Sequence, residues 1–139
     1  MIRIVGVTWR YPYADQASLG EIDLQVEPGE FVILCGASGS GKSTALRLMN
    51  GLIPHFHDEG VLTGTVTVDG LPTATAELDA IGLVTGTVLQ HPRRQFFTES
   101  VPEEVAFAME NFGLPSDRIS ARVGETVADL AVGVPADQP

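Results

Sequence analysis

Glycine, serine and a single lysine are concentrated in one short stretch, CGASGSGKST, which occupies residues 35–44. Residues 36–43 match the spacing G-x-x-x-x-G-K-[ST], in which glycines let the backbone curl so that successive N–H groups point at an anion. Lys42 can reach the outer phosphates of a nucleotide, Ser43 can offer its hydroxyl to Mg²⁺, and Thr44 can contact the phosphate nearer the sugar. The stretch therefore predicts a phosphate-binding loop, built from Gly36, Ala37, Ser38, Gly39, Ser40, Gly41, Lys42, Ser43 and Thr44.

A phosphate-binding loop needs a strand before it and a helix after it, and the flanking sequence predicts both. Phe31–Cys35 is a continuous apolar run, typical of a strand buried on both faces of a parallel sheet. A helix that begins near Ser43 and stops at Asn50-Gly51 would direct its N-terminal dipole at the bound phosphate. Further strands are expected at Ile2–Thr8, Ile22–Val26, Val61–Val68 and, from a second apolar run, Ile81–Leu89.

The last third of the chain predicts two helices. Ser100, Pro102 and Glu103 match the cap, the first-turn proline and the capping-box acid of a helix that would end near Asn111. A Gly-Leu-Pro segment separates this helix from a second one over Ser116–Val132. Strands thus come first, β/α alternation follows, and helices close the chain. The expected fold class is α/β, a P-loop NTPase (RecA-like) core preceded by an antiparallel β layer and followed by the start of a helical subdomain.

Length and composition restrict the class of protein. The 139 residues fit one domain, and a hydrophobic content of 44% is enough to form a core. A net charge of −10 argues against binding to nucleic acid or anionic lipid, so any membrane contact is expected to pass through a protein partner. The single cysteine, Cys35, excludes an internal disulfide framework and is expected to be a small core residue. No apolar stretch approaches the length of a membrane span, and no secretory signal is expected.

The loop motif alone indicates a nucleoside triphosphate and does not choose among transport ATPases, GTPases and small kinases. The alternative without a ligand is a Gly/Ser-rich surface loop, which the strand before it and the helix after it disfavour. A second candidate site, His55, His57, Asp58 and Glu59, could suggest a metal cluster. His-x-His on a loop is a weak pattern and no further ligand is evident, so a solvated loop is expected there.

Several segments outside the loop complete a recognisable pattern, namely Tyr11, Val26–Phe31, Leu46–Leu52, Gly51–Phe56, Leu89–Phe97 and Glu104–Leu114. Through them the chain resembles the nucleotide-binding domain of ABC transporters over nearly its whole length. Within that superfamily it is most similar to the ATPase subunits of energy-coupling factor importers, which take up vitamins and cobalt or nickel ions. The resemblance implies ATP and Mg²⁺ as ligands, a second ATPase subunit or domain as dimer partner, and a peripheral place at the cytoplasmic face of the cell membrane.

The resemblance also implies roles for single residues. Tyr11 matches the aromatic residue that stacks on the adenine ring, with Tyr13 as the alternative because the two flank one proline. Gln90 matches the glutamine that reaches Mg²⁺ and the attacking water. Lys42 and Gln90 would then be the catalytic residues, and Ser43 and Gln90 the Mg²⁺ ligands. Read without the resemblance, the tyrosines would be amphipathic surface residues and Gln90 a polar loop residue.

The segment Arg93–Asn111 would, by the same resemblance, form the surface that receives a helix of the transmembrane subunit. Two positions near it depart from the family pattern. His91 stands where asparagine is usual, and Glu104 stands where the subfamily often has aspartate. The first departure makes the contacts around Gln90 uncertain, and the second is a mild change.

Several parts of the family's catalytic site are not found in this sequence. The family needs an apolar strand that ends in Asp-Glu, but Asp58-Glu59 follows His-Phe-His, and Asp69 is followed by a turn glycine. The Leu-Ser-Gly-Gly-Gln signature and the histidine that senses the γ-phosphate are missing as well. Residues 1–139 are therefore expected to be the N-terminal part of one nucleotide-binding domain, incomplete at the C-terminus.

Within that part, the antiparallel layer is expected over residues 1–30, the P-loop core over 31–98 and the start of the helical subdomain over 99–139. Its function would be that of an ATP-binding subunit that couples Mg-ATP to the import of a small solute, a vitamin or a metal ion. By itself the chain is expected to bind nucleotide weakly and to hydrolyse little. The alternative is a truncated nucleotide-binding fragment without hydrolytic activity.

Overall fold

The computed structural model describes residues 1–130 of the chain. They belong to two compact units, one over Met1–Thr87 and one that begins at Val88. The two units are described separately below. The subdivision at residues 30 and 98 that the sequence suggests stays a prediction.

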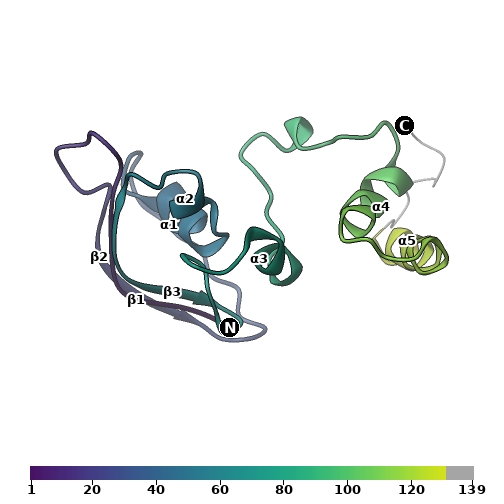
Figure 1. Cartoon of the computed structure of the whole chain (residues 1–139), viewed down its shortest axis with the longest axis horizontal. Helices are drawn as coiled ribbons and strands as arrows, with labels where there is room; N and C mark the ends of the chain where they lie inside the picture. Colours follow the sequence, from purple (N-terminus) through teal and green to yellow (C-terminus); the bar gives the residue numbers. More distant parts are fainter. Residues whose placement is uncertain (131–139) are drawn as a thin grey trace. The chain divides into compact units, whose positions relative to one another are not determined.

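A four-stranded antiparallel sheet forms one layer of the first unit (Figure 1). Its strands are β1 (Ile2–Arg10), β2 (Leu19–Val26), β3 (Val61–Val68) and β4 (Leu71–Pro72), in the order β2-β1-β3-β4. Alternation of apolar and polar residues predicts the first three of these strands, and β1 and β2 are longer than expected. The antiparallel β layer is confirmed, with β3 as an additional member.

Two glycines set the course of β1 and β3 where the register of their pairing shifts. Gly6 has φ 56° and Gly64 has φ 74°, both in the left-handed region. A Cβ atom on Gly64 would lie 2.4 Å from the carbonyl oxygen of Gly6, so only glycine fits there. The irregularity inserts an extra residue into the alternation of β1, and Ile4, Val7 and Trp9 are all buried in the core as a result.

Two helices cover the sheet of the first unit on the side of its core. Helix α1 (Lys42–Met49) starts inside the phosphate-binding loop, and the single turn α2 (Leu52–His55) follows it. As predicted, Asn50 ends α1, and Gly51 (φ 76°) redirects the chain. The buried cluster that these helices share with the sheet consists of Ile4, Val7, Trp9, Leu19, Ala45, Leu48, Met49, Ile53, Val66 and Val68.

The second unit contains a short 3-10 helix (Pro92–Arg94) and the helices α4 (Val101–Asn111) and α5 (Ser116–Leu130). The predicted start of α4 is confirmed, because the Ser100 side chain accepts a hydrogen bond from the backbone N–H of Glu103 at 3.5 Å. Helix α5 begins at the predicted residue, and its expected end at Val132 lies outside the described residues.

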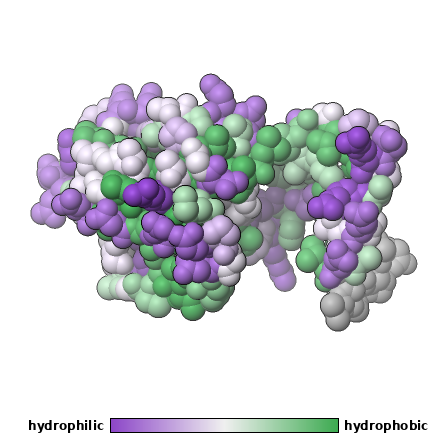
Figure 2. All heavy atoms as spheres, turned by 90° about the horizontal axis from the view of Figure 1, so that it is seen from below, coloured by the Kyte–Doolittle hydropathy of each residue, from purple (hydrophilic) through white to green (hydrophobic). Residues whose placement is uncertain are grey.

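The predicted strand Phe31–Cys35 is wrong. This segment forms neither helix nor strand, Phe31 is 88% exposed, and Cys35 is an exposed free thiol and not a core residue. A strand buried on both faces needs a neighbouring strand on each side to bond its N–H and C=O groups. Among residues 1–130, β1 to β4 pair only with one another, so this segment has no neighbouring strand. Apolar side chains therefore remain at the surface among hydrophilic ones (Figure 2).

The predicted strand Ile81–Leu89 is also wrong. Its first half belongs to helix α3 (Leu78–Val84), and residues 85–89 form neither helix nor strand. Short apolar runs are ambiguous between helix and strand, and here burial decides, because Ile81 is 1% exposed and packs beside Gly51. The acidic Asp79 in the first turn suits a helix N-terminus.

Candidate functional site

The phosphate-binding loop joins the irregular segment 31–35 to helix α1. Gly39 (φ 79°) and Gly41 (φ 90°) are left-handed, and the N–H of Ser40 donates to the carbonyl of Ala37 at 3.3 Å. A Cβ atom on Gly41 would lie 2.8 Å from Cδ1 of Leu19, where the loop passes strand β2. The backbone can therefore curl tightly over the start of α1, as an anion-binding loop requires.

Lys42 directs its ammonium group back into this loop. Its Nζ donates to the carbonyl oxygens of Gly36 at 2.9 Å and Ala37 at 2.6 Å, and to the Ser40 hydroxyl at 3.2 Å. These contacts use the three donors that a lysine carries. Phosphate oxygens are charged and are therefore stronger acceptors than carbonyls for the same donors.

The end of the loop lies against the predicted adenine-binding residue. Thr44 is 8% exposed, and its Oγ1 lies 3.4 Å from the hydroxyl oxygen of Tyr11. Ser43, in the first turn of α1, is exposed. The structure thus brings together residues that lie 33 positions apart in the sequence.

The two candidate tyrosines have different surroundings. The Tyr11 ring makes perpendicular contacts with the rings of Trp9, at 5.6 Å between centroids, and His57, at 5.1 Å. Tyr13 is 93% exposed, and its hydroxyl donates to the Glu59 carboxylate at 2.9 Å. Of the two, Tyr11 is the one whose contacts lead to the phosphate loop, and its role toward adenine stays a prediction.

Gln90 lies in the second unit and is exposed. It is therefore described apart from the loop, and its proposed role toward Mg²⁺ stays a prediction. Its neighbour Leu89 is held locally, because the backbone N–H of Leu89 donates to Oε1 of Gln95 at 2.6 Å.

Glu104 has a structural role that its mild departure from the family pattern did not reveal. One carboxylate oxygen accepts hydrogen bonds from the backbone N–H groups of Phe97 at 3.0 Å and Thr98 at 3.1 Å, and from the Thr98 hydroxyl at 3.0 Å. The Phe97 ring stacks on Phe107 of α4, with 4.8 Å between centroids. These contacts tie residues 97–98 to the start of α4, inside the segment expected to receive a membrane partner.

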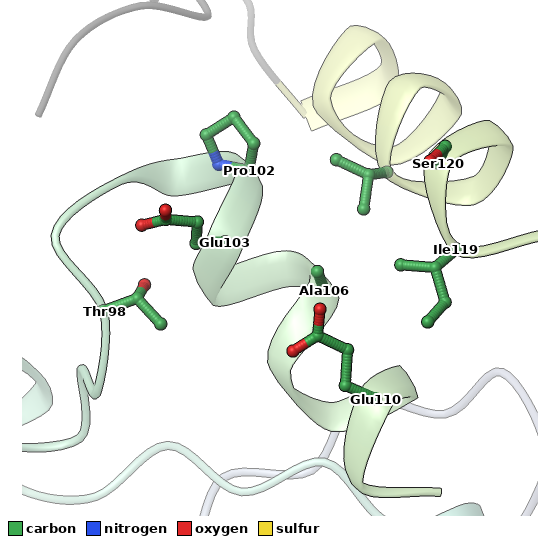
Figure 3. A pocket seen from close by; sticks show the side chains of 8 residues that line it. Thr98, Pro102, Glu103, Ala106, Glu110, Ile119 and Ser120 are labelled. Atoms are coloured by element: carbon green, nitrogen blue, oxygen red, sulfur yellow. The ribbon is translucent and has the colours of Figure 1, made fainter. Parts of the chain in front are cut away.

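A cavity of about 630 Å³ lies between α4 and α5 (Figure 3). None of the predicted phosphate, base or Mg²⁺ residues lines it. Its walls combine apolar side chains with hydroxyls and two carboxylates, contributed by Thr98, Pro102, Glu103, Ala106, Glu110, Ile119, Ser120 and Val123. The α5 residues that line this cavity were not singled out from the sequence, although the 3–4-residue spacing of Ile119 and Val123 is typical of one face of a helix.

The histidines of the second candidate site have other contacts. Nε2 of His55 lies 3.1 Å from the carbonyl oxygen of Thr73, and His57 contacts Tyr11. Over residues 1–130, no group of three or more His, Cys, Asp or Glu side chains is arranged to hold a metal ion. Over the same residues, no helix has the length and apolar character needed to cross a bilayer.

Comparison with known proteins decides the family. A family model described as ABC transporter matches residues 19–134. The chain belongs to the ABC transporter family. The match includes the whole phosphate loop and both helices of the second unit as far as they are described.

Curated ABC transporter relatives are similar over most of this chain. A putative ABC transporter ATP-binding protein of Streptomyces coelicolor is 43% identical over 127 residues, which are 91% of this chain and 22% of the relative. A protein of the same description in Treponema denticola is 38% identical, over 95% of this chain and 27% of the relative. Another in Pyrococcus horikoshii is 42% identical, over 88% of this chain and 43% of the relative. The chain thus spans less than half the length of these relatives.

A solved structure confirms the fold class. The dimeric structure of an ATP-binding cassette in a post-hydrolysis state, bound to ADP and Pi, matches with a TM-score of 0.69 and 24% identity. The match covers 100% of this chain and 62% of the other. This ABC transporter chain therefore has the α/β fold of an ABC ATPase with its antiparallel β layer, and it spans part of such a domain.

Proposed function

We propose that this chain is the ATP-binding part of an ABC transporter subunit and that it binds Mg-ATP at Gly36–Thr44. The observation that carries the proposal is the contact between Tyr11 and Thr44, at 3.4 Å between their hydroxyl oxygens. It places an aromatic ring at the end of the phosphate loop where the sugar and base of a nucleotide would follow the phosphates. Family membership supports the same ligand.

The residues present fit the phosphates and the metal ion. A Cβ atom would be crowded at two of the loop glycines, since one on Gly36 would lie 2.9 Å from the Ser40 hydroxyl and one on Gly41 would lie 2.8 Å from the Ser18 carbonyl oxygen. Lys42 would exchange its carbonyl acceptors for phosphate oxygens. Mg²⁺ needs few protein ligands because phosphate oxygens and water complete its octahedron, and we assign the Ser43 hydroxyl and Gln90 to it. When bound, the ion neutralises charge on the transferred phosphate.

We further propose that the whole subunit serves an importer of the energy-coupling factor type, with a vitamin or a metal ion as the transported solute. The supporting residues are those of the family pattern around Gly51–Phe56 and Leu89–Phe97. The surface offered to a transmembrane subunit would be Arg93–Asn111, where Glu104 and the Phe97–Phe107 stack hold the chain in place. A second ATPase subunit or domain would complete the dimer.

Removal of the Lys42 ammonium tests the nucleotide site. We expect Lys42→Ala to weaken Mg-ATP binding by the 139-residue chain roughly tenfold to a hundredfold, the effect of losing charge-assisted hydrogen bonds to phosphate. Isothermal titration calorimetry gives the dissociation constant. Arg47→Ala is the matched control, because it removes a positive charge from the same helix at an exposed position outside the loop.

Equal affinity of Lys42→Ala and the unchanged chain for Mg-ATP would contradict the proposed site.

A cross-linker placed at residue 97 of the full-length protein tests the importer proposal in the source cells. We expect mass spectrometry to identify a multi-span membrane protein in the cross-link. Cross-links to soluble proteins alone would contradict that part of the proposal.

A further inference from the structure

A tight turn at His57–Gly60 meets the end of strand β1. The turn is closed by a hydrogen bond from the N–H of Gly60 to the carbonyl of His57 at 3.0 Å, and the N–H of His57 donates to the carbonyl of Pro54 at 2.6 Å. Its side chains contact two tyrosines that follow β1, since His57 contacts Tyr11 and Glu59 accepts from Tyr13.

The third contact of this turn is with Trp9, which is fully buried. A Cβ atom on Gly60 would lie 2.1 Å from Cη2 of Trp9, so the backbone of the turn lies directly on the indole ring. Such close approach is possible only for glycine. The turn is therefore anchored to the core of the first unit, and the position of its first residue, His57, is fixed by that anchor.

Three contacts hold the Tyr11 side chain. Trp9 and His57 each meet its ring at nearly a right angle, 86° and 89° between ring planes, and the Thr44 hydroxyl lies 3.4 Å from its hydroxyl oxygen. Two of these partners lie in the buried core. His57 is the one that comes from a surface turn, and it is half-buried. Edge-to-face pairs of this kind add stabilisation beyond that of the buried area, and they restrict the rotation of the ring.

We propose that His57 is a positioning residue for the base subsite and that it holds the Tyr11 ring at the orientation in which a purine base of a nucleoside triphosphate is bound. This inference rests on the proposed function. His57 acts through Tyr11 and does not touch the phosphates. Its removal should thus affect recognition of the base and leave recognition of the phosphate chain unchanged.

The test compares two ligands that share their phosphates. Mg-ATP carries a base, and magnesium tripolyphosphate does not. We expect His57→Ala to weaken Mg-ATP binding roughly three- to tenfold, the fold-change that corresponds to one aromatic contact, and to leave tripolyphosphate affinity unchanged. Trp9 is the single tryptophan of the chain and contacts Tyr11, so its fluorescence reports the titration alongside calorimetry.

Two further variants separate positioning from general loss of structure. His57→Phe keeps an aromatic ring and is expected to restore the ATP affinity that His57→Ala loses. Asp58→Asn changes an exposed residue of the same turn and is expected to leave both affinities unchanged. Equal losses for both ligands, or no loss for ATP, would overturn the role of His57. Binding of neither ligand by the unchanged chain would overturn the proposed function as well.

Discussion

At the scale of single residues, the loop between Gly36 and Thr44 shows which features of a site can be predicted from residue types and spacing. The motif predicts which residues contact phosphate, because glycine, lysine and hydroxyl side chains suit that task. It does not reveal that Lys42 bonds to the carbonyls of Gly36 and Ala37, since these contacts depend on the shape of the loop. For the same reason the contact of His57 with Tyr11 could not be predicted from a weak His-x-His pattern.

Gly64 carries a prediction at this scale. We expect Gly64→Ala to lower the free energy of unfolding by roughly 2 kcal/mol or more, because the added Cβ atom meets backbone oxygens at 2.4 Å and φ is 74°. Urea denaturation followed by circular dichroism measures the change. Gly70→Ala is the matched control, because φ is 83° there and the added atom meets nothing within 4 Å. Gly70→Ala should lower the free energy of unfolding by about 1 kcal/mol, the effect of the backbone strain alone. Equal losses for the two variants would show that the close approach of β1 and β3 does not matter.

At the scale of elements, signals that act within a few residues predict the structure and signals that depend on distant partners do not. The cap of α4 at Ser100 and the stop of α1 at Asn50 are local, and both are confirmed. The segment Phe31–Cys35 is apolar enough for a central strand, yet a strand forms only where another strand bonds to it. The antiparallel strands β1 and β3 meet this condition within the first unit, which is why their alternation is a reliable guide.

The cap of α4 gives the prediction at this scale. We expect Ser100→Ala to destabilise α4 by about 1 kcal/mol, because the backbone N–H of Glu103 loses its acceptor. Hydrogen exchange of the amides in the first turn of α4 measures the loss. Ser120→Ala removes the same hydroxyl from the interior of α5, where it bonds to the carbonyl of Ser116, and is expected to change exchange little. Unchanged exchange in Ser100→Ala would show that Pro102 and the acidic first turn suffice to start the helix.

At the scale of the whole molecule, the candidate functional residues are distributed over the two units. The phosphate loop, Tyr11 and His57 lie in the unit Met1–Thr87, and Gln90 and the surface Arg93–Asn111 lie in the unit that begins at Val88. Sequence resemblance assigned roles to Tyr11, Gln90 and the surface Arg93–Asn111, assigned none to His57, and could not describe how these residues are held. The fold class was predicted correctly, because the loop motif indicated a P-loop core and the alternating strands indicated the antiparallel layer, and a solved structure confirms both.

Catalysis gives the prediction for the whole chain. We expect the 139 residues alone to hydrolyse ATP about a hundredfold or more slowly than a full-length ABC ATPase, because their sequence contains no apolar strand that ends in Asp-Glu, whose glutamate would polarise the water. A coupled assay of phosphate release, with Lys42→Ala as the background control, measures turnover. Full-rate hydrolysis that Lys42→Ala abolishes would refute the expectation and exclude the binding-only alternative.

The exposed segment Phe31–Leu34 has a consequence for the 139 residues studied in isolation. An exposed apolar stretch without secondary structure is the feature that holdase chaperones and proteases bind on incompletely folded chains. Phe31 is 88% and Ile33 68% exposed, and the segment leads directly into the loop at Gly36. A chaperone on this segment and a nucleotide in the loop would occupy neighbouring residues and hinder each other. We therefore expect ATP to slow the binding of a holdase chaperone to the isolated 139-residue polypeptide.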